Sequence, residues 1–591
     1  MTEKQIEPAK TNNCCRKIRI SKFKNLGINK PVEMTLNRTL DKDRMGGVVW
    51  LVGKNGAGKS NILKAIDSVG KTPEERNYPR SLDDDGVPST SLLYYDHDTL
   101  FEVKSKLDNR PNMEYDWTEA LKDEEFEDCV HQAYFNAHDD KFDDYPGLSE
   151  EDTVGQANFL KNNLSRDEAL YYLDQDIYFK YIDKAKPKKD SKNLSFKDRY
   201  GYDPFPNIVW YKQQHIEQKD FRCNKDEPNA FFTHLLTSLK GGKGLEKVRK
   251  AYERYEKSLD NAALRNAEKQ LNDDLREYSD LFNKLFRFDR LAYSFQIYLN
   301  ESKIEFGLLQ AGESRIIEDE SDGFRWFFDF FFNFRCGNKL SIGDIVLMEE
   351  PGTALHAEGR AEFSAIIREY AHATGLTFVM STHDACMLDP DYMDDVRIIF
   401  RRNKYESDVY DKFTVVEQDN ADQLNSLLKA LTVGRHALLD PKYDVVFVEG
   451  ITDYNYLTAF KILLGRENIR FLPVNGLGDA KDDERKKQII ECLMAISRNP
   501  VMLVDGDGSG KRMYELCQNT GVTVCLLSDV KSATKLTQIE DAFDKGDYDA
   551  LGLSKEWHAT SVFKQYIKSE KLSQTTKANF EAIFEMLEES L

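Results

Sequence analysis

The strongest structural signal in this chain is residues 53–60, which read GKNGAGKS. They match the pattern GxxxxGK[ST], follow a buried apolar run at 48–52 and precede an amphipathic helical stretch, which is the setting of a phosphate-binding loop. Glycines let successive backbone N–H groups face one concavity that cradles phosphate oxygens. The lysine places its charge on the β- and γ-phosphates, and the serine offers an oxygen to Mg²⁺. The predicted nucleotide ligands are Gly53, Asn55, Gly56, Gly58, Lys59 and Ser60.

Two later strands complete the predicted nucleotide site. The apolar run 345–348 ends at Glu349 and Glu350, and the run 376–380 leads to His383. Acids at the end of a buried strand suit a Walker B arrangement, in which Glu349 holds the Mg²⁺ shell and Glu350 polarises the attacking water. Aspartate is commoner at the first position, so Glu349 is a departure that keeps the charge. His383 stands where a histidine that senses the γ-phosphate is expected.

A helix N-terminus between these motifs is a third candidate. Ser321 and Gly323 open the aromatic run GFRWFFDFFFNF, and the N-terminus of a helix favours anions. The segment resembles the signature of ABC-type ATPases, which implies contact with the γ-phosphate held by a second copy; an ordinary helix cap is the alternative. The tripeptide at 311–313 (AGE) is a weaker candidate for the same role. Gln213 and Gln214 are weak candidates for a further ligand of the nucleotide site.

The C-terminal third has its own group of carboxylates. The buried run 445–448 ends at Glu449, with Asp453 close behind, and the run 500–504 ends at Asp505 and Asp507. Parallel strands that end in acids bring them to one edge of a sheet, where α/β sites form. Hard carboxylate oxygens select Mg²⁺ or Mn²⁺, and several of them suit a two-metal displacement at phosphorus. The alternative is an acidic face without a catalytic role.

Other side chains could complete this second site. Glu540 and Asp541 lie on a helix-like turn and are predicted to complete a second metal position. A cation for the transition state could come from several lysines, among which the sequence does not decide: Lys511, Lys555, Lys564 and Lys568. We therefore expect Glu350, His383, Glu449 and Asp505 to carry the chemistry of the two sites.

Charge and cysteine content limit the class of protein. The formal net charge is −20, so any contact with nucleic acid must use local basic patches or bound cations. The nine cysteines contain no CxxC pair, which disfavours a zinc site or a disulfide framework and favours a reducing cytoplasm. The N-terminus has no apolar core of a signal peptide. The apolar run 324–334 is too short and too charged to span a bilayer, so we predict a buried helix.

The chain is predicted to be α/β with two domains. Residues 1–437 would form an ABC-type P-loop ATPase with an insertion at 70–300 that includes a helical arm near 243–285. Residues 438–591 would form a Rossmann-like α/β domain that starts at the strand after Pro441.

The order of motifs resembles the SMC-like branch of ABC ATPases, and the E…DxD pattern of Glu449, Asp505 and Asp507, with the glycine turn at 475–478, resembles the Toprim fold. Together they resemble the OLD (overcoming lysogenization defect) nucleases, including those of Gabija- and retron-type antiphage systems. The resemblance covers 17–70, 305–390 and 443–545.

This resemblance implies ATP and Mg²⁺ or Mn²⁺ as cofactors, a homodimer or higher homo-oligomer formed through the ATPase heads, and cleavage or nicking of DNA, with RNA as a possible substrate. It also implies a role in antiphage defence, with a helicase or a reverse transcriptase–DNA complex as a partner. Two alternatives remain: a topoisomerase- or primase-like enzyme, and an SMC-like ATPase scaffold that binds nucleic acid or a partner without cutting.

Overall fold

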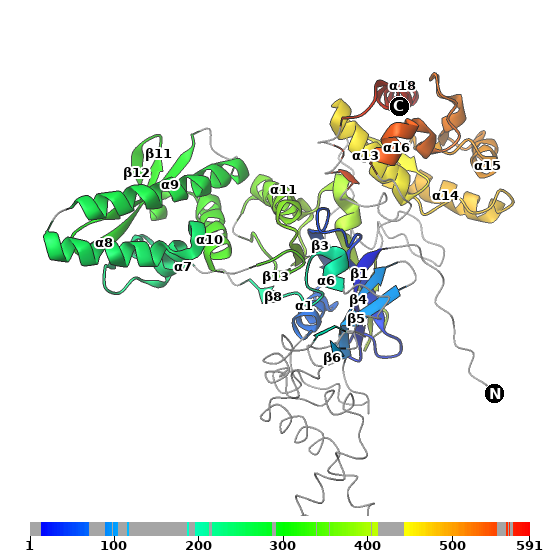
Figure 1. Ribbon diagram of the computed structural model, residues 1–591. Helices are drawn as coiled ribbons and strands as arrows, with labels where there is room; N and C mark the ends of the chain where they lie inside the picture. The colour runs from blue at the N-terminus through cyan, green and yellow to red at the C-terminus, as the bar shows by residue number, and fades with distance from the viewer. Residues whose placement is uncertain are drawn as a thin grey trace, which may run out of the picture.

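The structure is a computed structural model. It describes residues 14–69, 89–96, 99–103, 115–116, 186–187, 196–211, 215–259, 261–286, 291–337, 340–353, 355–403, 405–411, 443–551, 563–564, 567 and 571–591. In Figure 1 the strands of the N-terminal half lie at the centre, a helical lobe extends to one side, and the C-terminal elements gather at the opposite upper side.

The central sheet has six strands in the order β16-β15-β3-β14-β13-β8. All neighbours in it are parallel except β16, which pairs antiparallel with β15. The strands are β3 (Gly47–Gly53), β8 (Ile208–Trp210), β13 (Ile345–Glu349), β14 (Thr377–Thr382), β15 (Val396–Arg401) and β16 (Ser407–Tyr410). Because β3, β13 and β14 run in one direction, the segments that follow them all leave the sheet at the same edge.

Both faces of this sheet are covered, which explains its uninterrupted apolar runs. Alternate residues of a strand point to opposite faces. Val49 and Leu51 share a core with α1 (Lys59–Asp67), whereas Val48 and Trp50 share the other core with α11 (Ala357–Thr374). The first core is closed by an antiparallel sheet of β1 (Cys15–Ser21), β2 (Val32–Asn37), β4 (Ser89–Asp96) and β5 (Thr99–Val103).

The helical lobe combines four helices with a second antiparallel sheet. Helices α8 (Gly244–Ser258) and α9 (Ala262–Leu285) occupy the region expected to form a helical arm, but α9 packs along β10 and buries Leu271 and Leu275. The other elements are α7 (Ala230–Ser238), α10 (Asp322–Gly337), β9 (Arg222–Asn224), β10 (Tyr293–Leu299), β11 (Lys303–Gln310) and β12 (Glu313–Arg315). In this structure the helical pair is therefore part of a packed lobe.

Helix α10 contains the aromatic run and is buried, as the sequence predicts. Phe328 is fully buried and packs edge-on against Phe295 of β10, with ring centroids 6.0 Å apart. On another side of the helix, Trp326 meets Phe363 of α11 with ring centroids 4.5 Å apart. Helix α10 thus joins the lobe to the central sheet. Within the described residues no helix is both long and apolar enough to cross a membrane.

The C-terminal unit, residues 443–591 as far as they are described, has a four-stranded parallel sheet in the order β18-β17-β19-β20. Its strands are β17 (Asp444–Val448), β18 (Ile469–Pro473), β19 (Val501–Val504) and β20 (Thr523–Leu526). Its helices are α13 (Ile451–Leu464), α14 (Asp483–Ile496), α15 (Gly508–Cys517), α16 (Lys545–Ala550) and α18 (Gln574–Ser590). The expected boundary near residue 437 lies outside the described residues and stays a prediction.

Short elements complete the structure. They are β6 (Tyr115–Asp116), β7 (Lys186–Pro187), α6 (Phe196–Tyr200), and the 3₁₀ turns η3 (Gln218–Phe221), η4 (Lys240–Gly242), η5 (Ile317–Asp319), η6 (Ala385–Met387), η7 (Pro390–Asp395), η9 (Leu527–Asp529) and η10 (Ile539–Ala542).

Candidate functional sites

The predicted phosphate-binding loop joins β3 to α1, and two of its glycines have conformations that disfavour any other residue. Gly56 and Gly58 have φ values of 76° and 116°, in the left-handed region. A Cβ on Gly53 would lie 2.5 Å from the carbonyl oxygen of Ile399 on β15. These positions explain three of the predicted ligands as backbone requirements. Asn55 lies on the exposed tip of the same loop.

Lys59 begins α1 and is 7% exposed. Its ammonium donates to the Gly53 carbonyl oxygen at 2.7 Å, so the lysine bridges the two ends of the loop. Burial lowers the pKa of Lys59, while the negative charges of Glu350 and Glu349 act in the opposite direction. The next residue, Ser60, donates its hydroxyl proton to Oε1 of Glu349. The predicted Mg²⁺ ligands from α1 and β13 are therefore in direct contact.

Glu350 and His383 also meet. Glu349 pairs with Ser381 across the β13–β14 ladder, and the Glu350 amide donates to the Ser381 carbonyl oxygen at 3.1 Å. Glu350 itself has φ of 46°, a sparsely populated conformation for a residue with a side chain. Its Oε1 lies 2.9 Å from Nδ1 of His383. The two predicted catalytic groups of this site thus share a hydrogen bond at the end of neighbouring strands.

Two residues that hold this site are not among those predicted from the sequence. Asn25 lies on the turn after β1, accepts from the Asn61 amide at 2.6 Å, and its Nδ2 would lie 2.9 Å from a Cβ on Gly58. Arg360 of α11 donates to the carbonyl oxygens of Gly352 and Thr353 at 3.2 and 3.0 Å and pairs with Asp384. Neither lies in a motif that one sequence could reveal. Gln213 and Gln214 lie outside the described residues.

Ser321 and Gly323 lie at the start of α10. The Ser321 hydroxyl accepts from the Phe324 amide at 3.2 Å, so this serine caps the helix. Ser321 is exposed, and a Cβ on Gly323 would touch only Leu355 at 3.5 Å, an ordinary contact. The competing tripeptide at 311–313 forms the β11–β12 hairpin, with φ of 52° at Ala311 and 86° at Gly312. It therefore has no helix N-terminus to offer to an anion.

The family profile described as an AAA ATPase domain (AAA_15) matches residues 17–387, which is more than half of the chain. The chain belongs to this AAA ATPase domain family. The matched region includes the loop at 53–60, both glutamates that follow β13, and His383. The AAA ATPase domain implies nucleotide binding, usually with Mg²⁺, and the contacts of Lys59, Ser60 and Glu349 lie where that nucleotide would bind.

Among the solved structures that are similar to this chain are three SMC heads. One is an SMC head bound to the C-terminal winged-helix domain of ScpA, with a TM-score of 0.31 and 16% identity over 67% of this chain and 96% of that chain. The SMC head domain from Thermotoga maritima has a TM-score of 0.29 and 13% identity, over 67% of this chain and 98% of that chain. The third is an SMC head domain with an extended coiled coil, bound to the C-terminal domain of ScpA from Pyrococcus furiosus. Its TM-score is 0.26 and its identity is 15%, over 67% of this chain and 95% of that chain. The comparison with curated proteins gave no match.

The second group of carboxylates lies in the C-terminal unit, beyond the part of the chain that matches the AAA ATPase domain. Strands β17 and β19 are direct neighbours, with Val448 opposite Leu503. Glu449 and Asp505 each follow the end of one of these strands, so the two carboxylates meet at one edge of the sheet. We call Glu449, Asp453, Asp505, Asp507, Glu540 and Asp541 the C-terminal acidic cluster.

Electrostatics show that the members of this cluster are close to one another. Burial, followed by the charge of Asp507, raises the pKa of Glu449. Burial and then the charge of Asp505 raise the pKa of Asp453. Burial and then Glu449 raise the pKa of Asp505 to about 7, with smaller contributions from Glu540, Asp507 and Asp541. A carboxylate whose strongest electrostatic neighbours are other carboxylates is destabilised in its charged form.

Members of the cluster also accept backbone hydrogen bonds, Glu449 among them from Leu477 and Asp505. Asp453 accepts from the Gly450 amide at 2.8 Å, and Asp507 accepts from the Gly510 amide at 2.8 Å. Asp541 accepts from the amides of Thr537 and Gln538, at 2.8 and 3.0 Å. These bonds fix one oxygen of each side chain at the start of a helix or turn. Glu540 follows on η10, and its charge acts on both Asp453 and Asp505.

The donor set suits a hard divalent cation because it consists of carboxylate oxygens. One buried oxygen, Oε2 of Glu449, makes no hydrogen bond, so it is free to bind a cation. Within the described residues, however, no group of three or more acidic, histidine or cysteine side chains is arranged to hold a metal ion. The chemistry of the cluster therefore fits a metal, while its side chains do not converge on one point.

Two of the candidate lysines can be located. Lys511 is exposed on α15. Lys564 is fully buried and forms an ion pair with Asp394 of the ATPase domain at 3.0 Å, which occupies it away from the acidic cluster. Lys555 and Lys568 lie outside the described residues. A lysine that sequence analysis did not consider, Lys486 of α14, is buried and donates to the Leu477 and Asp479 carbonyl oxygens at 3.2 and 2.6 Å.

Proposed function

We propose that this ATPase is a divalent-metal-dependent nuclease of the OLD type, in which nucleotide governs cleavage of DNA by a C-terminal Toprim domain. One observation carries the proposal: Glu449 and Asp505 follow adjacent parallel strands, the charge of Glu449 raises the pKa of Asp505, and the charge of Asp507 raises the pKa of Glu449. Repelling carboxylates at one sheet edge are destabilising alone and are stabilised by a cation. The antiphage role and the helicase or reverse transcriptase–DNA partner come from the family resemblance.

Each residue of the cluster has a proposed part. Glu449 and Asp505 would hold the first cation, because one is at the end of each strand. Asp453 and Asp507 would keep one oxygen on a backbone amide and offer the other, and Glu540 and Asp541 would complete a second position. A divalent ion there would supply activation of water and stabilisation of the leaving oxygen at phosphorus. The chain's own contribution is to hold these oxygens at a fixed sheet edge.

The test is cleavage of supercoiled plasmid by the full chain with Mn²⁺, with and without ATP. We expect nicked or linear product from the unmodified protein and none from Asp505→Asn. Arg466→Gln is the matched control, because the Arg466–Glu588 pair lies on the surface of the same unit. Cleavage that survives Asp505→Asn, or that no metal supports, would overturn the nuclease assignment. Replacing plasmid by single-stranded RNA tests the other substrate.

We also propose that the ATPase functions as a homodimer in which Ser321 and Gly323 meet the γ-phosphate held by the other copy. The exposed start of α10 supports this role. In a Glu350→Gln background, which is expected to retain ATP, the dimer should form on addition of ATP. Ser321→Asp keeps a good helix cap but puts a carboxylate against the phosphate. We expect Ser321→Asp to abolish the ATP-dependent dimer, measured by light scattering, and to leave the melting temperature unchanged. If the dimer persists, Ser321 only caps the helix and the proposed contact is wrong.

A second function also has an observation in its favour. Because no metal-holding group is found among the described residues, the C-terminal unit could bind nucleic acid or a protein without cutting it. The chain would then be an SMC-like ATPase scaffold. This alternative predicts no cleavage under any metal, together with nucleic-acid binding that is unchanged by Asp505→Asn. Calorimetric titration with Mn²⁺ separates the two functions independently of cleavage, since only the nuclease requires binding that depends on Asp505.

A further inference from the structure

The segment after His383 contains five aspartates, each with a basic partner. We call residues 384–395 the acidic connector; it comprises η6, η7 and their caps. Its aspartates pair from two sides, as Asp384–Arg360, Asp389–Arg368, Asp395–Arg368, Asp391–Lys461 and Asp394–Lys564. The arginines belong to α11 of the ATPase domain, and the lysines belong to the C-terminal unit. The connector is therefore held between the two parts of the chain.

The nucleotide end of the connector is fixed by Arg360. This guanidinium binds the carbonyl oxygens of Gly352 and Thr353, just after Glu350, as well as the carboxylate of Asp384, just after His383. It thus ties together the two loops that carry the two catalytic groups. The planar guanidinium suits this task because its donors point in fixed directions. Asp384 also caps η6 by accepting from the Cys386 amide at 2.8 Å.

The C-terminal unit binds the other end of the connector, in η7. The Tyr454 hydroxyl donates to the Pro390 carbonyl oxygen and accepts from the Met393 amide, both at 2.9 Å. Lys461, two turns farther along α13, reaches Asp391 at 2.6 Å. Lys564 also donates to the Asp391 carbonyl oxygen at 2.6 Å. These contacts satisfy backbone groups of η7 that lie inside the protein, so removing them would loosen the turn itself.

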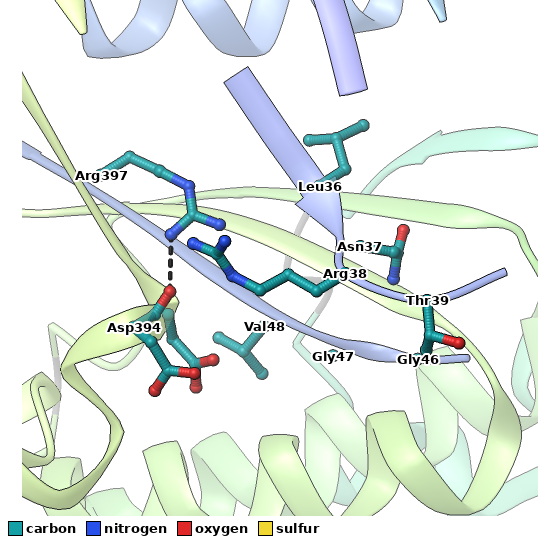
Figure 2. A pocket seen from close by; sticks show the side chains of 10 residues that line it. Leu36, Asn37, Arg38, Thr39, Gly46, Gly47, Val48, Asp394 and Arg397 are labelled. Atoms are coloured by element: carbon teal, nitrogen blue, oxygen red, sulfur yellow. Dashed lines mark hydrogen bonds between the residues drawn. The ribbon is translucent and has the colours of Figure 1, made fainter. Parts of the chain in front are cut away.

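The ATPase domain also contacts the end of the connector that the C-terminal unit holds. Figure 2 shows Arg397 of β15 donating to the Asp394 carbonyl oxygen, at a distance of 2.7 Å. Beside this bond lies a cavity of about 20 Å³ lined by Arg38 and Val48, among other residues. Tyr392 packs under the guanidinium of Arg368, whose carbon lies 3.8 Å from the ring centroid. The connector is thereby anchored to the strand next to β3, which leads into the phosphate-binding loop.

We propose that Arg360 and, from the C-terminal unit, Tyr454 and Lys461 are positioning residues for ATP hydrolysis, because they fix the connector that follows His383. They set where His383 stands against Glu350, whose 2.9 Å hydrogen bond depends on two loops keeping their relative position. Small displacements of catalytic groups are costly: about 1 Å can cost on the order of 100-fold in rate. The C-terminal unit is then part of the support of the ATPase site.

The same contacts lead to the acidic cluster. Helix α13 carries Tyr454 and Lys461, and its first turn carries Asp453. A change in the connector therefore acts on the helix whose N-terminus holds part of the cluster. On the same helix, the buried side chains of Asn455 and Thr458 make no hydrogen bond within the described part of the chain.

The first experiment measures steady-state ATP hydrolysis and nucleotide affinity in the full chain. We expect Arg360→Gln to lower kcat about tenfold or more with the dissociation constant of a fluorescent ATP analogue within twofold, and Arg360→Lys to restore part of the rate. Tyr454→Phe and Lys461→Met should lower kcat several-fold, again without a change in affinity. Arg466→Gln, a surface pair of the same unit, should hydrolyse ATP at the unmodified rate.

The second experiment separates positioning from simple loss of stability. Hydrogen exchange is compared with and without ATP in the Glu350→Gln protein. Nucleotide should change exchange in the connector and in residues 451–464, and Tyr454→Phe should abolish the change in 451–464 only. If folded Tyr454→Phe and Lys461→Met proteins hydrolyse ATP at the unmodified rate and α13 exchanges identically in both states, the proposal is wrong. Because these measurements involve ATP alone, their outcome does not depend on whether the chain cuts nucleic acid.

Discussion

The two groups of carboxylates in this chain occupy equivalent places in their sheets but have opposite surroundings. Glu349 accepts from Ser60, and Glu350 shares a hydrogen bond with His383, so each has a partner from another element. Glu449, Asp453 and Asp505 are partly buried, and the charges of neighbouring carboxylates help to raise their pKa values. The ATPase site is therefore organised by the protein before a cofactor binds. The carboxylates of the C-terminal acidic cluster are destabilised in their charged form, and the proposed cation would relieve this repulsion.

The largest expected effect tests whether the ATPase site and the C-terminal acidic cluster are independent of one another. Lys59→Ala removes the charge that bridges the phosphate-binding loop, and we expect ATP hydrolysis to fall at least about 100-fold, the cost of losing a main electrostatic contact to the transition state. Mn²⁺ binding that depends on Asp505 should be unchanged, as measured by calorimetry. Equal loss of both activities would show that the sites are not independent.

Asp505→Asn is expected to have a nearly as large effect on activity, but it should stabilise the fold. The change should abolish cleavage while raising the melting temperature of the metal-free protein, by about 2–4 °C if relief of repulsion is on the order of 1 kcal/mol. Differential scanning calorimetry with and without Mn²⁺ measures this shift. The control is Glu349→Gln, which removes a partnered carboxylate and should not stabilise the protein. A lower melting temperature for Asp505→Asn would contradict the repulsion.

A backbone substitution should produce an intermediate effect confined to the C-terminal cluster. A Cβ on Gly510 would lie 2.0 Å from the Asp505 carbonyl oxygen, whereas a Cβ on Gly508 would meet Ala480 at an ordinary 3.6 Å. We expect Gly510→Ala to weaken Mn²⁺ binding about 10- to 100-fold, as changes around metal ligands do. Gly508→Ala should bind as the unmodified protein does. Similar affinities for both variants would mean that the turn at 505–510 does not position the ligands.

The smallest effect is the dependence of the acidic cluster on pH. Asp505 has a pKa of about 7 in the folded chain, above its usual 3.8, so its protonated form is favoured in the fold. Its contribution to stability is present below pH 3.8 and is lost as pH rises through about 7. Metal binding displaces this proton, so the apparent Mn²⁺ affinity should rise by up to about tenfold per pH unit between pH 6 and 7. Calorimetry in buffers of different ionisation enthalpy would detect the released proton, and an affinity independent of pH would contradict the shift.

Much of both sites could be predicted because the signals are local. A buried apolar run followed by an acid or by a glycine loop identifies a strand and its functional end, which is how Lys59, Glu350 and Glu449 were found. The roles of Arg360 and Lys564 could not be predicted this way, because they depend on Asp384 and Asp394, which lie far from them in the chain. The AGE tripeptide at 311–313 was the weaker candidate for the contact with a second copy, and pairing of β11 with β12 makes it a hairpin.

The amino-acid sequence by itself determined the elements and the chemistry at their ends: a phosphate-binding loop between a strand and a helix, and acids that follow buried strands. These follow from periodicity and residue type, which act over a few residues. Only the tertiary structure decided which ends meet. Strand order placed Glu350 beside His383 and Glu449 beside Asp505, and packing of α13 against η7 joined the ATPase domain to the C-terminal unit. Contacts between residues distant in the chain arise from the packing of complete elements, so a single sequence carries no local signal for them.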